Sequence, residues 1–213
     1  MTKGILYQII SVVRTPAGIS AVIELPGSEE RETLLLSGEF WTPLGLSRGD
    51  TIEEDTLSEL RRAELLSRAV SRCVKILAGS DHSRSQLLRK LKMFGFEEEI
   101  ASLAADYAEE HGYIDEERQA LSAAESFVRH KYWGRKRIAA ELLMRGYKKT
   151  AILYAADHIS DEAYMTALHV LLDRKYKIAM EKEDRDRLFA SLYRQGFSLS
   201  EINAAVKELE NEE

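Results

Sequence analysis

The sequence predicts a mainly α-helical protein: three tandem three-helix repeats in an elongated curved array, with a small N-terminal β-rich module. All three prolines of the 213 residues lie within the first 43 positions, so the rest of the chain is free to form helices. A motif with the signals of one short helix recurs three times without gaps. One such unit buries little apolar surface alone, whereas tandem units share a core.

Residues 4–36 have the composition of β-strands. The segments 5–13, 19–25 and 32–37 are rich in apolar and β-branched residues, and turn sequences with proline and glycine separate them. Residues 38–50 contain three glycines and are expected to form a connecting loop, and from Glu53 onward the apolar spacing becomes helical. The predicted parts are therefore a β-rich module over 1–55 and repeats over 56–112, 113–159 and 160–213.

The repeated motif occupies residues 83–96, 134–147 and 184–197. Its three glycines, at 95, 146 and 196, are each followed by an aromatic residue, Phe96, Tyr147 or Phe197. The first residue of each copy (Ser83, Gly134 or Asp184) is of a type that caps helices, and apolar residues follow at plus 4 and plus 8. The glycine suits a left-handed residue after a helix, and the aromatic residue after it is expected to pack in the core.

Each copy therefore predicts a helix of about eleven residues between two other helices. The flanking helices are expected over 58–79 and 97–112, over 115–132 and 148–159, and over 161–179 and 198–210. The last begins with Ser198 and Glu201 in the spacing of a capping box. Acidic residues 115–117 are expected at the start of a helix, where the dipole favours negative charge, instead of in a metal or acid–base site.

The charges are unevenly distributed along the chain. Residues 1–60 hold four basic and ten acidic residues, and the remaining residues hold 26 of each. Within that neutral part, residues 61–95 contain nine basic and two acidic residues, and residues 129–149 contain eight and one. Such clusters indicate a local anionic partner surface. The acidic N-terminal module is expected either to pack on a basic repeat or to contact a basic partner.

Several functional classes lack support in the sequence. The single cysteine, Cys73, excludes an intrachain disulfide, fits a reducing compartment and has the helical spacing of a buried thiol. We find neither a signal peptide nor an apolar run long enough to span a membrane, so a cytoplasmic protein is expected. The histidines are scattered, and no phosphate loop or nucleophile elbow occurs. We expect no catalytic site, metal, cofactor or small-molecule substrate.

Two segments, 111–120 and 134–147, together with the repeat, resemble the RecX family of recombinase regulators. The family pattern Gly-Tyr-hydrophobic-acid-acid-Glu-Arg is met by residues 112–118, although Gln119 replaces the usual aromatic residue. The pattern Gly-x-x-Arg-Ile-x-x-Glu-Leu is met by residues 134–142, and residues 45–57 are similar to an N-terminal segment of some members. The resemblance covers roughly residues 57–210.

The resemblance implies a regulator that binds filaments of a RecA-type recombinase on DNA. It implies modulation, most often inhibition, of the ATPase, strand-exchange and coprotease activities, within homologous recombination, DNA repair and the SOS response. It also implies an elongated bundle that lies in the helical groove of the filament, without enzymatic activity or an obligatory cofactor. We expect a monomer.

The candidate partner-binding residues are eleven cations of the repeats, which would contact the filament or, more weakly, DNA. They are Arg84, Arg89, Lys90, Lys92, Arg135, Lys136, Arg137, Arg145, Lys148, Lys149 and Arg185. The six in the second repeat have no evident structural role in the sequence. The alternative interpretations are a solvated helix face, and an autonomous DNA-binding module of DNA repair or transcription, because 134–145 with 148–158 resembles a helix-turn-helix. Tyr132 and Trp133 form either a base-stacking platform or, as we favour, a hydrophobic staple.

Overall fold

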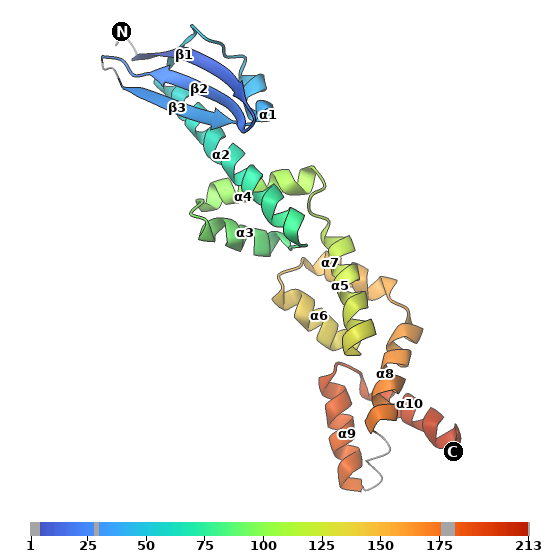
Figure 1. Cartoon of the computed structure of the whole chain (residues 1–213). Helices are drawn as coiled ribbons and strands as arrows, with labels where there is room; N and C mark the ends of the chain where they lie inside the picture. Colours follow the sequence, from blue (N-terminus) through green and yellow to red (C-terminus); the bar gives the residue numbers. More distant parts are fainter. Residues whose placement is uncertain (1–4, 28–29, 176–181, 213) are drawn as a thin grey trace. The chain divides into compact units, whose positions relative to one another are not determined.

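The computed structural model describes residues 5–27, 30–175 and 182–212, and the chain divides into two compact units (Figure 1). The first unit comprises Met1–Ser80 and Leu87–Tyr113, and the second comprises Asp81–Gln86 and Ile114–Glu213. The described residues form ten α-helices and one four-stranded antiparallel sheet near the N-terminus. The prediction of a mainly α-helical protein with a small N-terminal β-rich module is therefore confirmed.

The sheet has the strand order β3-β2-β1-β4 and is antiparallel throughout. Strands β1 (Leu6–Thr15), β2 (Gly18–Glu24) and β3 (Arg31–Leu36) match the three predicted segments with ends shifted by one or two residues, whereas β4 (Thr51–Glu53) was not predicted. The expectation of a loop over 38–50 is wrong for its first half, which forms α1 (Gly38–Trp41) and a 3₁₀ helix (Thr42–Leu44). Trp41 is buried in the core beside the sheet, so tertiary packing orders this segment.

A single long helix, α2 (Glu54–Gly79), connects the sheet with the helices of the first unit. Its first turns place Leu57 and Leu60 in the same core as the sheet. Its later turns bury Val70 and Cys73 and pack against α4 (Glu98–Glu110), which follows α3 (Arg84–Met93) in the chain, and Figure 1 shows this course. The predicted boundary after residue 55 thus falls inside α2, and the four-part division of the chain stays a prediction.

Acidic residues of the N-terminal module contact helices of the same unit. Arg61 of α2 donates from Nε and Nη2 to the two carboxylate oxygens of Glu32, at 2.8 and 2.7 Å. The Tyr107 hydroxyl of α4 donates to Glu39 at 2.5 Å. Of the two expectations for the acidic module, Glu32 follows the first, because it packs onto the basic helix α2, whereas Glu39 contacts α4, which contains no Lys or Arg.

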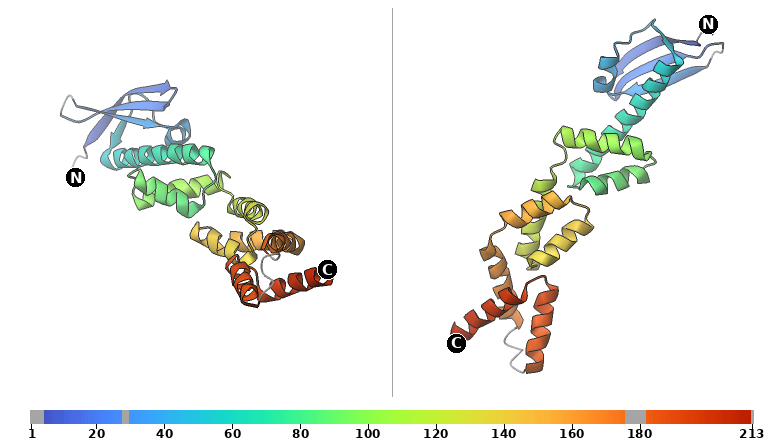
Figure 2. Two further views of the ribbon diagram at one scale, coloured as in Figure 1. Left: turned by 60° about the horizontal axis from the view of Figure 1, so that its bottom comes forward. Right: turned by 180° about the vertical axis from the view of Figure 1, so that it is seen from behind.

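The second unit contains α5 (Glu116–Lys131), α6 (Arg135–Met144), α7 (Lys149–His158), α8 (Asp161–Lys175), α9 (Lys182–Arg194) and α10 (Leu199–Glu212). Figure 2 shows these helices from two further sides. One hydrophobic cluster runs through all six of them. Ile138 and Leu142 of α6 and Leu188 and Leu192 of α9 are buried in it, at the two stripe positions that the motif predicted. Among the described residues, no helix has both the length and the apolar character needed to cross a membrane.

The three motif glycines end their helices as predicted. Gly95, Gly146 and Gly196 have φ angles of 86°, 77° and 98°, in the left-handed region that favours glycine. The aromatic residue after each glycine donates its N–H to a leucine carbonyl of the last turn, at 3.2, 3.2 and 3.4 Å. Tyr147 and Phe197 are buried, but Phe96 is only half-buried, so the expectation of a core aromatic is wrong at Phe96.

The starts of the three motif helices differ. Gly134 is the N-cap of α6, and the Ser83 hydroxyl accepts the N–H of Gln86 at 3.3 Å in the first turn of α3. Helix α9 begins at Lys182, so Asp184 lies inside the helix, and the prediction that it caps the helix is wrong. Lys182 and Glu183 are good helix formers, which is consistent with the earlier start.

Gly134 and Gly196 lie at a close contact between α6 and α9 within the second unit. The N–H groups of Gly134 and Lys136 donate to the carbonyls of Gln195 and Gly196, at 2.8 and 3.2 Å. The unsatisfied amides at the start of α6 thus meet carbonyls just beyond the end of α9. Likewise, the Ser83 hydroxyl donates to the carbonyl of Arg145 at 2.8 Å, just after α6 ends.

Candidate partner-binding surface

Arg135, Arg137 and Arg145, all predicted as partner-binding cations, are held by side chains of their own unit. Arg135 donates from Nη1 to Glu201 at 2.7 Å and from Nη2 to Asp161, and its guanidinium lies 4.0 Å from the ring centre of Tyr164. Burial acts to raise the pKa of Glu201, but hydrogen bonds from Ser198 and the Arg135 charge outweigh it, and the pKa lies below the usual value. Arg135 therefore ties α6 to α8 and α10.

Arg137 and Arg145 also have structural partners. Arg137 donates to the side-chain carbonyl of Gln195, and Arg145 donates from Nε to Glu141 at 2.9 Å. The Arg145 guanidinium lies 4.8 Å from the ring centre of Phe127. The expectation that the six cations of the second repeat have no structural role is therefore wrong for Arg135, Arg137 and Arg145. The sequence did not reveal these roles because Asp161, Glu201 and Gln195 are distant in sequence, and Glu141 meets Arg145 only when α6 has formed.

Trp133 packs against its own unit. Its ring centre lies 4.8 Å from that of Phe127, and the charges of Lys131 and Arg137 lie 4.5 and 4.1 Å from the indole ring. The ring partner, Phe127, lies on α5 before Trp133, whereas a hydrophobic staple would join Trp133 to an apolar residue of α6, so the staple stays a prediction. Two cations over the ring disfavour the base-stacking interpretation. Tyr132, next to it, has a left-handed φ of 53° at the end of α5.

The remaining predicted cations are largely exposed. Four of them are exposed in the second unit: Lys136 on α6, Lys148 just before α7, Lys149 at the start of α7 and Arg185 on α9. The Lys136 ammonium lies 5.3 Å from the ring centre of Tyr193. Three are exposed on α3 in the first unit: Arg89, Lys90 and Lys92. The Lys92 ammonium pairs with Glu98 at 2.8 Å. Arg84, at the start of α3, is half-buried and belongs to the second unit. These exposed cations remain the candidates for partner contact.

Glu116 has a structural role that the sequence did not reveal. Its buried carboxylate accepts the backbone N–H of Arg84 at 2.8 Å through Oε1 and that of Lys148 at 3.0 Å through Oε2. It thus satisfies amides at the starts of α3 and α7. The Asp115 side chain caps α5 through the N–H of Arg118, so the prediction that these acids begin a helix is confirmed. No local signal distinguishes Glu116 from an ordinary first-turn acid.

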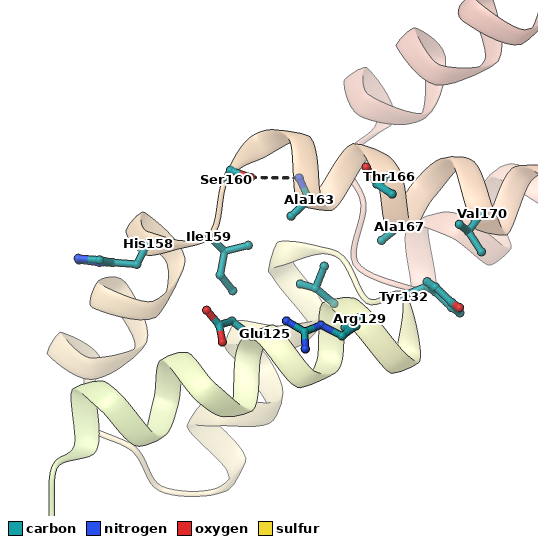
Figure 3. Close-up of a pocket in the computed structure, with 11 residues that line it drawn as sticks. Glu125, Arg129, Tyr132, His158, Ile159, Ser160, Ala163, Thr166, Ala167 and Val170 are labelled. Carbon is teal, nitrogen blue, oxygen red and sulfur yellow. Dashed lines mark hydrogen bonds between the residues drawn. The ribbon is translucent and has the colours of Figure 1, made fainter.

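A pocket of about 480 Å³ lies between α5, the end of α7 and α8 (Figure 3). Glu125 and Arg129 extend toward it from α5, and Ile159 and Ala167 line it from the opposite side. None of the eleven predicted cations lines this pocket. In the part of the chain that the structure describes, no group of three or more His, Cys, Asp or Glu side chains is placed to hold a metal ion.

The known proteins to which this chain is similar belong to one family. No family model matches the chain. The chain is 33% identical to regulatory protein RecX of Pseudomonas savastanoi pv. phaseolicola over 115 residues, which are 53% of this chain and 71% of that protein. It is 27% identical to regulatory protein RecX of Caldanaerobacter subterraneus subsp. tengcongensis over 169 residues, 79% of this chain and 84% of that protein. For regulatory protein RecX of Staphylococcus carnosus the identity is 21%, and the chain spans 63% of its length.

A solved structure has the same fold. The crystal structure of a regulatory protein RecX superposes with a TM-score of 0.81 at 19% identity, covering 94% of this chain and 99% of that chain. A second, RecX from Lactobacillus salivarius, has a TM-score of 0.65 at 18% identity, covering 70% and 98%. Together with the relative that is 33% identical over most of its length, this fold shows that the chain belongs to the RecX family of regulatory proteins.

Proposed function

We propose that this protein regulates a RecA-type recombinase by binding the filaments that the recombinase forms on DNA. In this proposal binding lowers the ATPase, strand-exchange and coprotease activities. The observation that carries the proposal is membership of the RecX family of regulatory proteins. The protein would act in the cytoplasm as a monomer, in homologous recombination, DNA repair and the SOS response, without catalysing a reaction.

We also propose that helices α2–α4, α5–α7 and α8–α10 are three copies of one three-helix unit. The equivalent left-handed glycines and the equivalent bonds of the following aromatic residues support it. Two contacts between motif helices support it further: the start of α6 meets the end of α9, and the start of α3 meets the end of α6. A tandem arrangement suits a partner that is itself repetitive, because successive units can meet successive protomers.

The exposed cations are the proposed points of contact with the filament. A recombinase filament carries acidic side chains and DNA phosphates, and either attracts lysine and arginine. Because Arg135 is held by Asp161 and Glu201, its replacement would test folding more than binding. Lys149, which is exposed in the first turn of α7, is a better position for charge reversal.

The test is co-sedimentation with recombinase filaments, together with the recombinase ATPase rate. Lys149→Glu and Lys90→Glu are each expected to weaken binding roughly threefold to tenfold, about 1 kcal/mol. Lys207→Glu, on the exposed surface of α10, is the control with the same charge change. Wild-type protein that changes neither ATPase nor strand exchange at saturation would refute the proposed function. An equal loss in the control would refute the location of the contacts.

Autonomous DNA binding is the second candidate function. It is favoured by the pair α6 and α7, which a short turn connects and which carries exposed Lys136, Lys148 and Lys149. Phosphate binding through these lysines would fall steeply with salt and would not require recombinase. Binding to a short DNA duplex at low salt, measured without recombinase, therefore distinguishes the two functions.

A further inference from the structure

Helix α6 is apolar on two opposite faces. One face places Ile138 and Leu142 in the core of the second unit. The other carries Leu143 and Met144, whose side chains are 66% and 76% exposed. At 100° per residue, Lys136, Ala140, Leu143 and Met144 share this outer face, and all four are exposed. The helix therefore has a second apolar face, which the hydrophobic core of its own unit does not use.

The outer face of α6 continues onto α9. Tyr193 occupies the same motif position in α9 as Leu143 does in α6, and it is 51% exposed. The ammonium group of Lys136 lies 5.3 Å from the centre of the Tyr193 ring, so the two helices are joined at this point. We call the exposed surface of Lys136, Ala140, Leu143, Met144 and Tyr193 the α6 face. Single exposed apolar residues are ordinary, but a contiguous set indicates an interaction site.

The surroundings of the α6 face are positively charged. Lys136 lies on it, and Lys148 and Lys149 are exposed just beyond the end of the helix. The acid of α6, Glu141, is paired with Arg145, so it does not offset the charge of Lys136. An apolar centre with a cationic rim fits a protein surface in which an apolar recess is bordered by carboxylates.

Two other occupants fit less well. A second copy of this chain, docked by the same face across a two-fold axis, would bring the lysines at 136, 148 and 149 of both copies into one interface, where they repel one another. DNA offers phosphates to the rim but little to the centre, because Leu143 and Met144 neither bind phosphate nor stack well on bases, and Tyr193 is the one aromatic ring of the α6 face. Charge and chemistry therefore favour an acidic protein partner.

We propose that the α6 face is the surface by which this protein docks on a recombinase protomer, with Leu143 and Met144 filling an apolar recess bordered by carboxylates. The proposal rests on the proposed function. The corresponding end of α3 in the first unit is also apolar and exposed: Met93 is 81% exposed and lies next to Phe94, which is 54% exposed. A filament of identical protomers repeats its surface, so two docking points of one kind can both be occupied.

The double variant Leu143→Ser/Met144→Ser tests the docking surface. Both side chains are exposed, so the far-UV circular dichroism spectrum and the thermal unfolding midpoint should match the wild type. Co-sedimentation with recombinase filaments should show at least a tenfold loss of affinity, as expected for central apolar contacts. Adding Met93→Ser should weaken binding further. The control is Val13→Ser/Leu65→Ser, which removes two exposed apolar side chains from β1 and α2 and should stay within twofold of the wild type.

The outcomes separate the proposals. Wild-type protein that does not bind filaments refutes both the proposed function and the docking surface. Wild-type binding that the double variant retains refutes only the docking surface. Self-association of the wild type in sedimentation velocity that the double variant abolishes assigns the face to a second copy. Loss of duplex binding measured without recombinase assigns it to DNA, and either result overturns this proposal.

Discussion

Replacement of Gly196 by alanine tests the contact between the end of α9 and the start of α6. A methyl group there would lie 2.5 Å from the backbone nitrogen of Arg137 and 2.8 Å from the carbonyl oxygen of Gly134. Both are backbone atoms, so the overlap can be relieved only by moving α6. Gly196 also has a φ of 98°, which residues with a side chain rarely adopt. The substitution therefore combines backbone strain with steric overlap.

Two other glycines separate these effects. Gly95 has a φ of 86°, but an added methyl group would meet no atom within 4 Å, so Gly95→Ala measures strain alone. Gly134 has a φ of −83°, which any residue adopts, but its methyl group would lie 2.5 Å from the carbonyl carbon of Gly196. Gly134→Ala therefore measures overlap alone.

The expected losses follow from general magnitudes. A left-handed residue other than glycine costs about 1–2 kcal/mol, and overpacking costs about 1–3 kcal/mol. Alanine returns about 0.4–1 kcal/mol because it restricts the unfolded chain. The free energy of unfolding should therefore fall by about 1 kcal/mol for Gly95→Ala, about 1–2 kcal/mol for Gly134→Ala and about 2–4 kcal/mol for Gly196→Ala.

Urea denaturation followed by far-UV circular dichroism measures these losses. The dependence on urea should keep the wild-type slope, because the substitutions change the folded state and not the surface exposed on unfolding. The reasoning is refuted if Gly196→Ala loses no more stability than Gly95→Ala. It is also refuted if Gly134→Ala is as stable as the wild type, since overlap would then cost nothing.

Three further outcomes are expected. Glu116→Ala should lose about 1–3 kcal/mol of unfolding free energy, because two partly buried amides at helix starts lose their acceptor, while Glu117→Ala, its exposed neighbour, should change little in the same urea titration. Cys73 should resist a thiol reagent at pH 8 until denaturant is added, because the thiol is fully buried and burial raises its pKa to about 11. Glu201 should stabilise the fold above its ordinary pKa of 4.5 and lose this effect as the pH falls through its lower folded-state pKa. Glu201→Gln should thus unfold more easily than the wild type at neutral pH, and the two should converge in acid; a constant difference at all pH values would contradict this.

Most helices of this protein were predictable because the signals that end them are local. A glycine followed by an aromatic residue marks a helix end within a few residues, and Gly95, Gly146 and Gly196 adopt the expected left-handed geometry. Strand β4 could not be predicted in this way. It has three residues and exists because it pairs with Leu6–Gln8 of β1, more than 40 positions earlier.

The candidate partner-binding surface was less predictable, because it also depends on contacts between residues that are distant in sequence. The sequence groups Arg135 with Lys136 as one basic cluster, but their surroundings differ. Arg135 meets Asp161 and Glu201, which are 26 and 66 positions away, whereas Lys136 faces outward. Similarly, Leu143 has the composition of a core residue, and only the packing of α6 shows that it is exposed.

The contact between α6 and α9 is made by main-chain N–H and C=O groups, and this has a consequence for sequence divergence. Every residue except proline supplies these groups, so the contact constrains composition only where a side chain would not fit, at Gly134 and Gly196. The outer surfaces of the helices can then change their residues, and with them their partner, while the framework stays the same. This explains how a fold can be shared at a TM-score of 0.81 with 19% identity, and it predicts that glycine persists at these two positions among relatives whose surfaces have diverged.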